Sequence, residues 1–305
     1  MPFTSKVLLV RPSRFGYNPE TVGSNAFQRP PLSDGDDVSK KALEEFDRVA
    51  DGLANAGVDV VTVADSPEPY TPDAVFPNNW FSTHPDGTLC LYPMEAEARK
   101  HERVPAHIEV IKARCGTERI IDLSHYEKSG RSLEGTGSLV IDHSRRLAYA
   151  CVSSRTDPGL VSEWAELTGH STMVFKGLGP DGRPLYHTNV MMSLGIGFAV
   201  VCLSAVPDKG ERRRLTDSFE DGGRRVLEID EEQMAGYAGN IIQLVTSGGE
   251  PLLAMSESAR RSLGGELLSE IAGHTDIVSF AIPMIERCGG GSLRCMTGEL
   301  FEGGS

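Results

Sequence analysis

One pattern recurs along most of this chain. Two short apolar strands are followed by a helix and a further strand, and the set returns about every 50 to 60 residues. Copies begin near Asp73, Gly137, His187 and Asn240. Spacing of this kind is typical of folds built from one repeated supersecondary unit. The sequence therefore favours a symmetric α/β architecture.

The first full copy shows the pattern in detail. Strands are predicted over 73–76 and 88–92, and the His84-Pro-Asp-Gly87 segment between them is a typical hairpin turn. A helix is predicted over 104–114 and a third strand over 119–123. The later copies repeat this order, with helices predicted over 158–167, 210–221 and 256–272.

A fifth copy is predicted to be divided between the ends of the chain. Its parts are a strand over 292–296, a strand over 7–10, a helix over 38–54 and a strand over 58–63. The helix has one apolar face at the 3.6-residue period. Five such units closed into a ring leave no edge strand exposed. We therefore expect one domain over residues 1–305, a five-bladed α/β propeller.

An ordinary doubly wound parallel sheet is the alternative fold, because strands and helices alternate there too. That fold often carries a GxGxxG or GxxxxGK[ST] phosphate loop, and the sequence contains neither. The Gly289-Gly290-Gly291 run leads into a predicted strand rather than a helix.

Charge and cysteine content exclude several classes of function. The net charge is −13, whereas a nucleic-acid-binding surface needs a basic face. No stretch approaches the ~20 apolar residues of a membrane span, and the N-terminus lacks the pattern of a signal peptide. The six cysteines include no CxxC pair. We therefore expect a cytoplasmic protein with no nucleic-acid or membrane partner and no zinc site.

Equivalent positions of the repeats carry reactive side chains. Asp73, Glu134, His187, Asn240 and Cys295 occupy matching places, and a ring brings such places together at its axis. A cysteine and a histidine with carboxylates nearby form an activated thiolate and a general acid. This combination predicts a catalytic site with Cys295 as the nucleophile and His187 as the acid and base.

Each of these residues also has a structural interpretation. Cys295 can be a buried strand cysteine, and His187 a hydrogen-bonded core histidine. Glu134 can be a surface acid, and Asp73 can cap a turn. The three glycines before Cys295 favour the functional interpretation, because they allow a ligand to approach the backbone. His84, His101 and His107, by contrast, are predicted to be structural.

Several segments resemble the guanidino-group-modifying, or pentein, superfamily, which includes arginine deiminase, dimethylarginine dimethylaminohydrolase and amidinotransferases. The resemblance covers nearly the whole chain and is closest to the citrulline-utilising hydrolase branch. It implies a five-bladed α/β propeller. The segments that carry it are 11–19, 73–80, 133–138, 152–157, 186–190 and 289–296.

The resemblance also implies roles in substrate binding. Arg155 matches an arginine that holds the substrate carboxylate, and Arg99 or Arg103 is expected to assist. Asp73 and Glu134 are expected to accept hydrogen bonds from substrate N–H groups and to orient His187.

Two departures from the deiminase pattern bear on the substrate. Asn79 and Asn189 stand where arginine deiminases carry aspartates. An ionised aspartate only accepts hydrogen bonds and suits a cationic guanidinium, whereas an asparagine also donates. Asn79, with help from Asn189, is therefore expected to donate to the oxygen of a neutral ureido group.

The sequence predicts a cysteine hydrolase that needs no metal or organic cofactor and converts citrulline to ornithine, carbon dioxide and ammonia. Arginine or methylarginine deiminases and an arginine dihydrolase are the alternative enzymes, with a ureido or guanidino amino acid as the partner molecule. An amidinotransferase and a non-catalytic binding protein on the same scaffold stay open. A homo-oligomer is a further alternative that the sequence leaves open.

Overall fold

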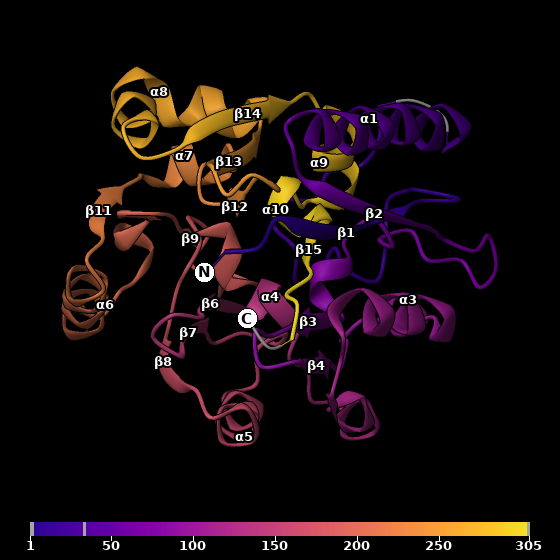
Figure 1. Ribbon diagram of the computed structural model, residues 1–305, viewed down its shortest axis with the longest axis horizontal. Coiled ribbons are helices and arrows are strands. Elements are labelled where there is room, and N and C mark those ends of the chain that lie inside the picture. The colour runs from indigo at the N-terminus through magenta and orange to yellow at the C-terminus, as the bar shows by residue number, and fades with distance from the viewer. Residues whose placement is uncertain (1–2, 33–34, 304–305) are drawn as a thin grey trace.

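Five three-stranded sheets surround a central axis in the computed structural model, which describes residues 3–32 and 35–303 (Figure 1). In each sheet the central strand pairs antiparallel with one neighbour and parallel with the other. The longer helices lie around the outside of the ring. The predicted five-bladed α/β propeller is confirmed.

The first blade contains β3 (Phe81–Thr83), β4 (Thr88–Leu91) and β5 (Arg119–Asp122). The helices α2 (Glu97–Lys100) and α3 (Pro105–Cys115) connect the last two strands, which run parallel because a helical crossover joins them. The strand predicted over 73–76 is wrong. That segment is a buried turn leading into the 3₁₀ helix η1 (Pro77–Asn79), because Pro77 starts a helical turn and donates no hydrogen bond to a sheet.

Blades two to four repeat the same order. The second has β6 (Leu139–Asp142), β7 (Leu147–Cys151), α5 (Pro158–Thr168) and β8 (Ser171–Phe175), preceded by α4 (Gly135–Ser138). The third has η3 (Thr188–Val190), β9 (Met192–Leu194), β10 (Phe198–Val201), α6 (Lys209–Asp221) and β11 (Arg225–Glu228). The fourth has α7 (Glu231–Ala235), β12 (Ile242–Val245), β13 (Pro251–Ser256), α8 (Glu257–Ala272) and β14 (Asp276–Phe280).

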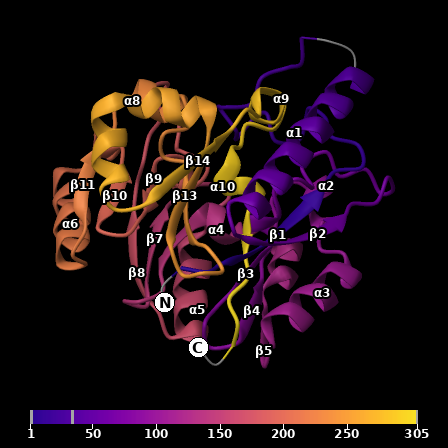
Figure 2. The same ribbon diagram turned by 45° about the horizontal axis from the view of Figure 1, so that its top comes forward.

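The fifth blade joins the two ends of the chain, as the sequence predicts. The strand β15 (Gly298–Glu299) pairs with β1 (Lys6–Arg11), which pairs with β2 (Asp59–Ala64) after the helix α1 (Gly35–Asn55). Figure 2 shows the yellow C-terminal segment running beside the indigo N-terminal strand. This pairing closes the ring.

The segment that carries Cys295 differs from its prediction. The predicted strand over 292–296 is instead a short helix, α10 (Leu293–Met296), which follows α9 (Pro283–Gly289). Leu293 and Met296 are both fully buried at helical spacing, and a run this short does not reveal its period. The strand of this blade begins only at Gly298.

The short strands that open the blades meet around the axis. Contacts join β15 to β3, β6 to β9, and β9 to β12. The segments just before these strands therefore converge at one end of the axis, and the hairpin turns after β3, β6, β9 and β12 lie at the other end. Across the described residues, no helix has the length and apolar character needed to cross a membrane.

Candidate active site

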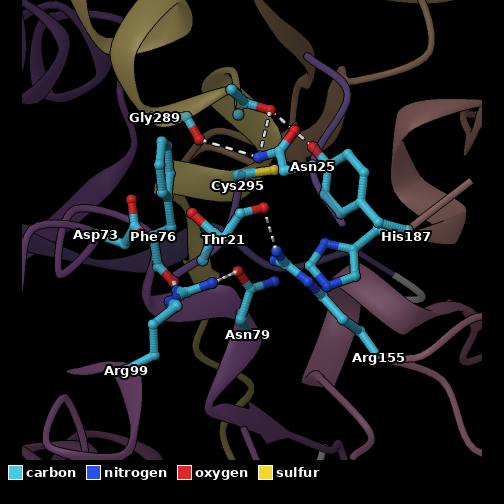
Figure 3. Close-up of a pocket in the computed structure, with 13 residues that line it drawn as sticks. Thr21, Asn25, Asp73, Phe76, Asn79, Arg99, Arg155, His187, Gly289 and Cys295 are labelled. Carbon is cyan, nitrogen blue, oxygen red and sulfur yellow. Dashed lines mark hydrogen bonds between the residues drawn. The ribbon is translucent and has the colours of Figure 1, made fainter. Parts of the chain in front are cut away.

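The five residues predicted from the repeats lie in the segments that precede the inner strands. All are buried, with exposed fractions of 3% or less: Asp73, Glu134, His187, Asn240 and Cys295. Three of them, Asp73, His187 and Cys295, line one small cavity (Figure 3). The fold therefore brings together side chains that are more than 200 residues apart in the sequence.

Glu134 and His187 form a hydrogen-bonded pair. The Nε2 atom of His187 lies 2.8 Å from Oε2 of Glu134. Burial alone would raise the pKa of Glu134, but Arg155 and His187 outweigh it and hold that pKa well below its usual range. An ionised carboxylate only accepts hydrogen bonds, so Nε2 carries the proton and Nδ1 keeps a lone pair. Burial lowers the pKa of His187, and Glu134 opposes part of that effect. The imidazole is therefore neutral at pH 7.

Gly135 and Gly137, which follow Glu134, allow the Glu134–His187 pair to lie close to Asn79. A Cβ atom at Gly137 would lie 2.7 Å from Nδ1 of His187 and would clash with Nδ2 of Asn79. Gly135 has a φ of +45°, and a Cβ atom there would lie 2.8 Å from the carbonyl oxygen of Asn79. The Glu134-Gly-Thr-Gly137 segment is therefore a tight spacer between His187 and Asn79 rather than a mobile loop.

Two amides point at the sulfur of Cys295. Nδ2 of Asn240 lies 3.3 Å from Sγ, and Nδ2 of Asn189 lies 3.5 Å from it. Asn240 also donates to the backbone oxygen of Asn189 at 2.9 Å, which fixes the orientation of the Asn240 amide. Asn189 thus lies beside the Cys295 sulfur and is not among the residues that line the cavity.

Asn79 is held in one orientation by a buried arginine. Nη1 of Arg99 donates to Oδ1 of Asn79 at 2.8 Å, while Nε and Nη2 of Arg99 bind Glu102 at 2.8 and 3.0 Å. Because a guanidinium only donates, Oδ1 must face Arg99 and the NH₂ group must face away. That Nδ2 atom is buried and has no hydrogen-bond partner among the described residues. Asn79 therefore presents a spare donor to the cavity.

Asp73 presents a spare acceptor to the same cavity. Its Oδ2 atom accepts a 2.8 Å hydrogen bond from Asn18, whereas Oδ1 is buried without a partner in the described part of the chain. Burial raises the pKa of Asp73, and Arg99 opposes that effect. An unpaired buried acceptor is costly unless a ligand completes it.

Arg155 lines the cavity from the opposite side to Asp73 (Figure 3). Its Nη2 donates to Oγ of Ser24 at 2.7 Å, and its Nη1 lies 3.5 Å from Oε2 of Glu134. Arg103, by contrast, does not line the cavity. Its guanidinium binds Glu127 at 2.8 Å and the Tyr92 carbonyl at 3.0 Å. Arg99 lines it, but its donors are engaged by protein acceptors.

A segment that sequence reasoning did not assign covers the site. Thr21 and Asn25 line the cavity, and Nδ2 of Asn25 donates to the Gly289 carbonyl at 3.2 Å. The Tyr186 hydroxyl donates to the Gly290 carbonyl at 2.7 Å. Gly290 has a φ of +65°, and a Cβ atom there would lie 2.6 Å from Asn25. In the sequence, only the family resemblance over residues 11–19 lies near this segment, and that resemblance assigns no role to the residues after it.

The closed cavity holds about 10 Å³, which is the space of roughly one water molecule. An amino acid the size of arginine does not fit in it. The segment 18–28, which contacts both Asp73 and the glycines before Cys295, must therefore move to admit a substrate. No group of three possible metal ligands lies in this cavity among the residues the structure describes.

A closed ring of five ββαβ units, with a buried cysteine, a histidine–carboxylate pair and arginines at its axis, defines a pentein-type, guanidino-group-modifying enzyme. The chain belongs to the family described as "N,N dimethylarginine dimethylhydrolase, eukaryotic", which matches residues 11–302. It is therefore a hydrolase of C–N bonds other than peptide bonds, within the guanidino-group hydrolases and deiminases. No curated protein matches the chain by sequence.

Solved structures share the fold at low sequence identity. The apo structure of ArgZ, an arginine dihydrolase from cyanobacteria, superposes with a TM-score of 0.75 at 15% identity, over 97% of this chain and 40% of that one. The N-terminal domain of ArgZ, covalently bound to a reaction intermediate, gives 0.74 at 16% identity, over 97% and 98% of the two chains. A dimethylarginine dimethylaminohydrolase adduct gives 0.66 at 17% identity, over 97% and 99%. The chain thus spans less than half of full-length ArgZ.

Proposed function

We propose that this enzyme hydrolyses citrulline to ornithine, carbon dioxide and ammonia through a covalent intermediate on Cys295. The observation that carries the choice of substrate is the buried, unpaired Nδ2 donor of Asn79, whose orientation Arg99 fixes. A ureido oxygen accepts a hydrogen bond at this donor, whereas a guanidinium offers only N–H groups. An unmet buried donor costs about 1–3 kcal/mol, so the site favours the ligand that supplies an acceptor.

The charges that line the cavity support a neutral group as well. Arg99 and Arg155 both lie in the lining, together with one acid, Asp73. Arg99 is neutralised by its paired Glu102, and the Glu134 carboxylate is already compensated by Arg155 and His187. Asp73 is the acid that keeps an unpaired oxygen, and it suits one ureido N–H group.

The reaction follows from these positions. The Cys295 sulfur attacks the ureido carbon, and the thiol proton passes to Nδ1 of His187. The C–N bond breaks as His187 returns the proton to the departing nitrogen, which leaves a thiocarbamate on Cys295. Water then attacks with His187 as the base, the C–S bond breaks, and the carbamate loses carbon dioxide. Overall, citrulline and one water give ornithine, ammonia and carbon dioxide.

The remaining site residues contact the substrate, His187 or Cys295. Glu134 orients His187 and stabilises the imidazolium formed during the transfer. Nη1 of Arg155, which is ion-paired with Glu134 at 3.5 Å, is the atom that we assign to the substrate carboxylate. Asn189 and Asn240 stabilise the thiolate. The cytoplasm is the proposed location, in keeping with six unpaired cysteines.

A guanidino substrate is the second candidate. It is favoured by the unpaired Oδ1 of Asp73, which suits a charged N–H group, and by the dimethylarginine named in the family description. Product analysis separates the candidates. Citrulline hydrolysis gives ornithine and one ammonia, deimination of arginine stops at citrulline, and a dihydrolase gives ornithine and two ammonia.

The test compares kcat/KM for citrulline, arginine and dimethylarginine, with products identified by mass spectrometry. The proposal requires ornithine from citrulline and a higher kcat/KM for citrulline than for either guanidino compound. Accumulation of citrulline from arginine, without further conversion, would contradict it.

A further inference from the structure

Three histidines far from Cys295 in the sequence meet at the other end of the ring axis. His84 follows β3, His143 follows β6, and His170 lies between α5 and β8. The catalytic segments precede the inner strands, whereas His84 and His143 follow them, so the cluster lies at the opposite end from the active site. The sequence predicted His84 to be structural and no zinc site to be present, because no two cysteines have the spacing of zinc ligands.

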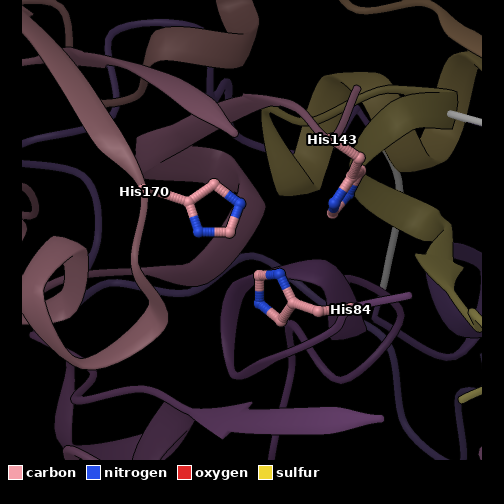
Figure 4. Close-up of side chains that lie close together, drawn as sticks. All are labelled: His84, His143 and His170. Atoms are coloured by element: carbon pink, nitrogen blue, oxygen red, sulfur yellow. The ribbon is translucent and has the colours of Figure 1, made fainter. Parts of the chain in front are cut away.

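The rings of His84, His143 and His170 converge on one point (Figure 4). One nitrogen from each lies within 4.8 Å of the other two. Zinc bonds histidine nitrogen at about 2.0–2.1 Å, so tetrahedral ligands stand ~3.4 Å apart. Small rotations of the two half-buried rings, His143 and His170, would bring the three nitrogens to this separation.

Hydrogen bonds at the far side of two rings direct the free nitrogens inward. Nε2 of His84 lies 3.0 Å from Oγ of Ser82, and Nδ1 of His84 is buried with no partner among the described residues. Nδ1 of His170 lies 2.9 Å from Oγ of Thr168, which leaves its Nε2. Metal-binding histidines usually carry such a second hydrogen bond, because it fixes the tautomer and the ring.

We propose that His84, His143 and His170 bind a zinc-class divalent cation, with water in the fourth position. Neutral imidazoles are good ligands for such ions. Asp86 and Arg146, which flank the cluster, lie 3.8 Å apart and offset each other. The cation joins the first blade to the second and so stabilises the ring without touching the catalytic groups.

The alternative is a stack of neutral aromatic rings. The Trp164 ring lies 4.9 Å from that of His170 and 6.0 Å from that of His84, and Phe301 lies 4.4 Å from His143. Packing of this kind explains the proximity of the rings but leaves Nδ1 of His84 without a partner. The two accounts differ in what zinc does to the protein.

The test uses full-length protein stripped of metal, in a Cys295→Ser background so that the active-site thiol does not bind the ion. Calorimetric titration with Zn²⁺ should show about one site, and saturating Zn²⁺ should raise Tm. His143→Asn and His170→Asn should each weaken binding at least ~tenfold and reduce the rise in Tm. His125→Asn, which changes an exposed histidine outside the cluster, should change neither.

Circular dichroism verifies that each variant is folded, and two separate ligand variants keep the test valid if one is unstable. Absence of stoichiometric zinc binding by the parent protein would overturn the proposal. Equal affinity in the parent and in either folded ligand variant would overturn it too, because the ion would then lie elsewhere.

Discussion

Nη1 of Arg99 donates a 2.8 Å hydrogen bond to Oδ1 of Asn79, and this contact decides which end of the Asn79 amide faces the cavity. The NH₂ group is left without a protein acceptor. The proposed preference for a ureido group over a guanidinium therefore depends on Arg99, which does not itself offer the substrate a free donor.

Asn79→Asp should shift preference from citrulline toward arginine. One carboxylate oxygen would stay paired with Arg99, and the other would replace a donor by a charged acceptor. A charge-assisted hydrogen bond contributes about 1.5–3 kcal/mol, and a lost buried donor costs about 1–3 kcal/mol. The ratio of kcat/KM for citrulline to that for arginine should fall about a hundredfold. Asn79→Ser is the matched control, since it adds no charge and should not raise activity on arginine. An unchanged ratio in an active Asn79→Asp enzyme would remove the main support for a ureido substrate.

The pH dependence of kcat/KM should report His187 as a base. Protonated His187 has no lone pair, so activity is lost as the pH falls through its pKa. Burial lowers that pKa below the ordinary 6.5, so the acidic limb should lie below pH 6.5. An acidic midpoint above that value would show that His187 is not the neutral base described here.

Glu134→Gln should reduce kcat about 10²-fold or more and move the acidic limb to still lower pH. The Glu134 charge and its hydrogen bond raise the pKa of His187, so their removal lowers it. The measurement is a pH profile of kcat/KM from about pH 5 to about pH 8, with circular dichroism at each pH. A loss of rate without any shift of the limb would indicate that Glu134 only maintains the fold.

Gly137→Ala should impair catalysis more than it impairs stability. Its Cβ atom would lie 2.7 Å from Nδ1 of His187, so the ring must shift. Such overpacking costs about 1–3 kcal/mol, and a displacement of the acid–base group should lower kcat/KM about 100-fold. Gly265→Ala is the control, because nothing lies within 4 Å of a Cβ atom there. The measurements are kcat/KM and Tm of the two variants. A wild-type kcat/KM in Gly137→Ala would contradict the claim that His187 needs the space left by Gly137.

The repeat could be predicted from the sequence because each blade has a similar length and order of elements. The division of one blade between the termini followed from the same pattern, and the pairing of β15 with β1 confirms it. The conformation of the short segments at the axis could not be predicted in the same way. Residues 73–76 and 292–296 are only partly apolar segments of strand length, and their turn and helix conformations arise from Pro77 and from contacts with other blades.

The site was predictable where equivalent repeat positions carry reactive groups, as with His187 and Cys295. Contacts between blades, by contrast, leave no pattern in the sequence around the residues that make them. The role of Arg99 depends on Asn79, which is 20 residues away, and the cover formed by Asn25 depends on glycines 264 residues away. The meeting of His84, His143 and His170 is likewise a product of ring closure rather than of spacing.

Selective labelling tests the role of Cys295 most directly. An ornithine derivative with an electrophilic chloromethyl amide on its side chain would place a reactive carbon where the ureido carbon binds. The account predicts one equivalent of label on Cys295, loss of activity in proportion, and protection by citrulline. Cys288→Ala should label normally, because that thiol is fully buried and does not line the cavity. Inactivation with the label on any cysteine other than Cys295, or labelling that citrulline does not slow, would contradict the account.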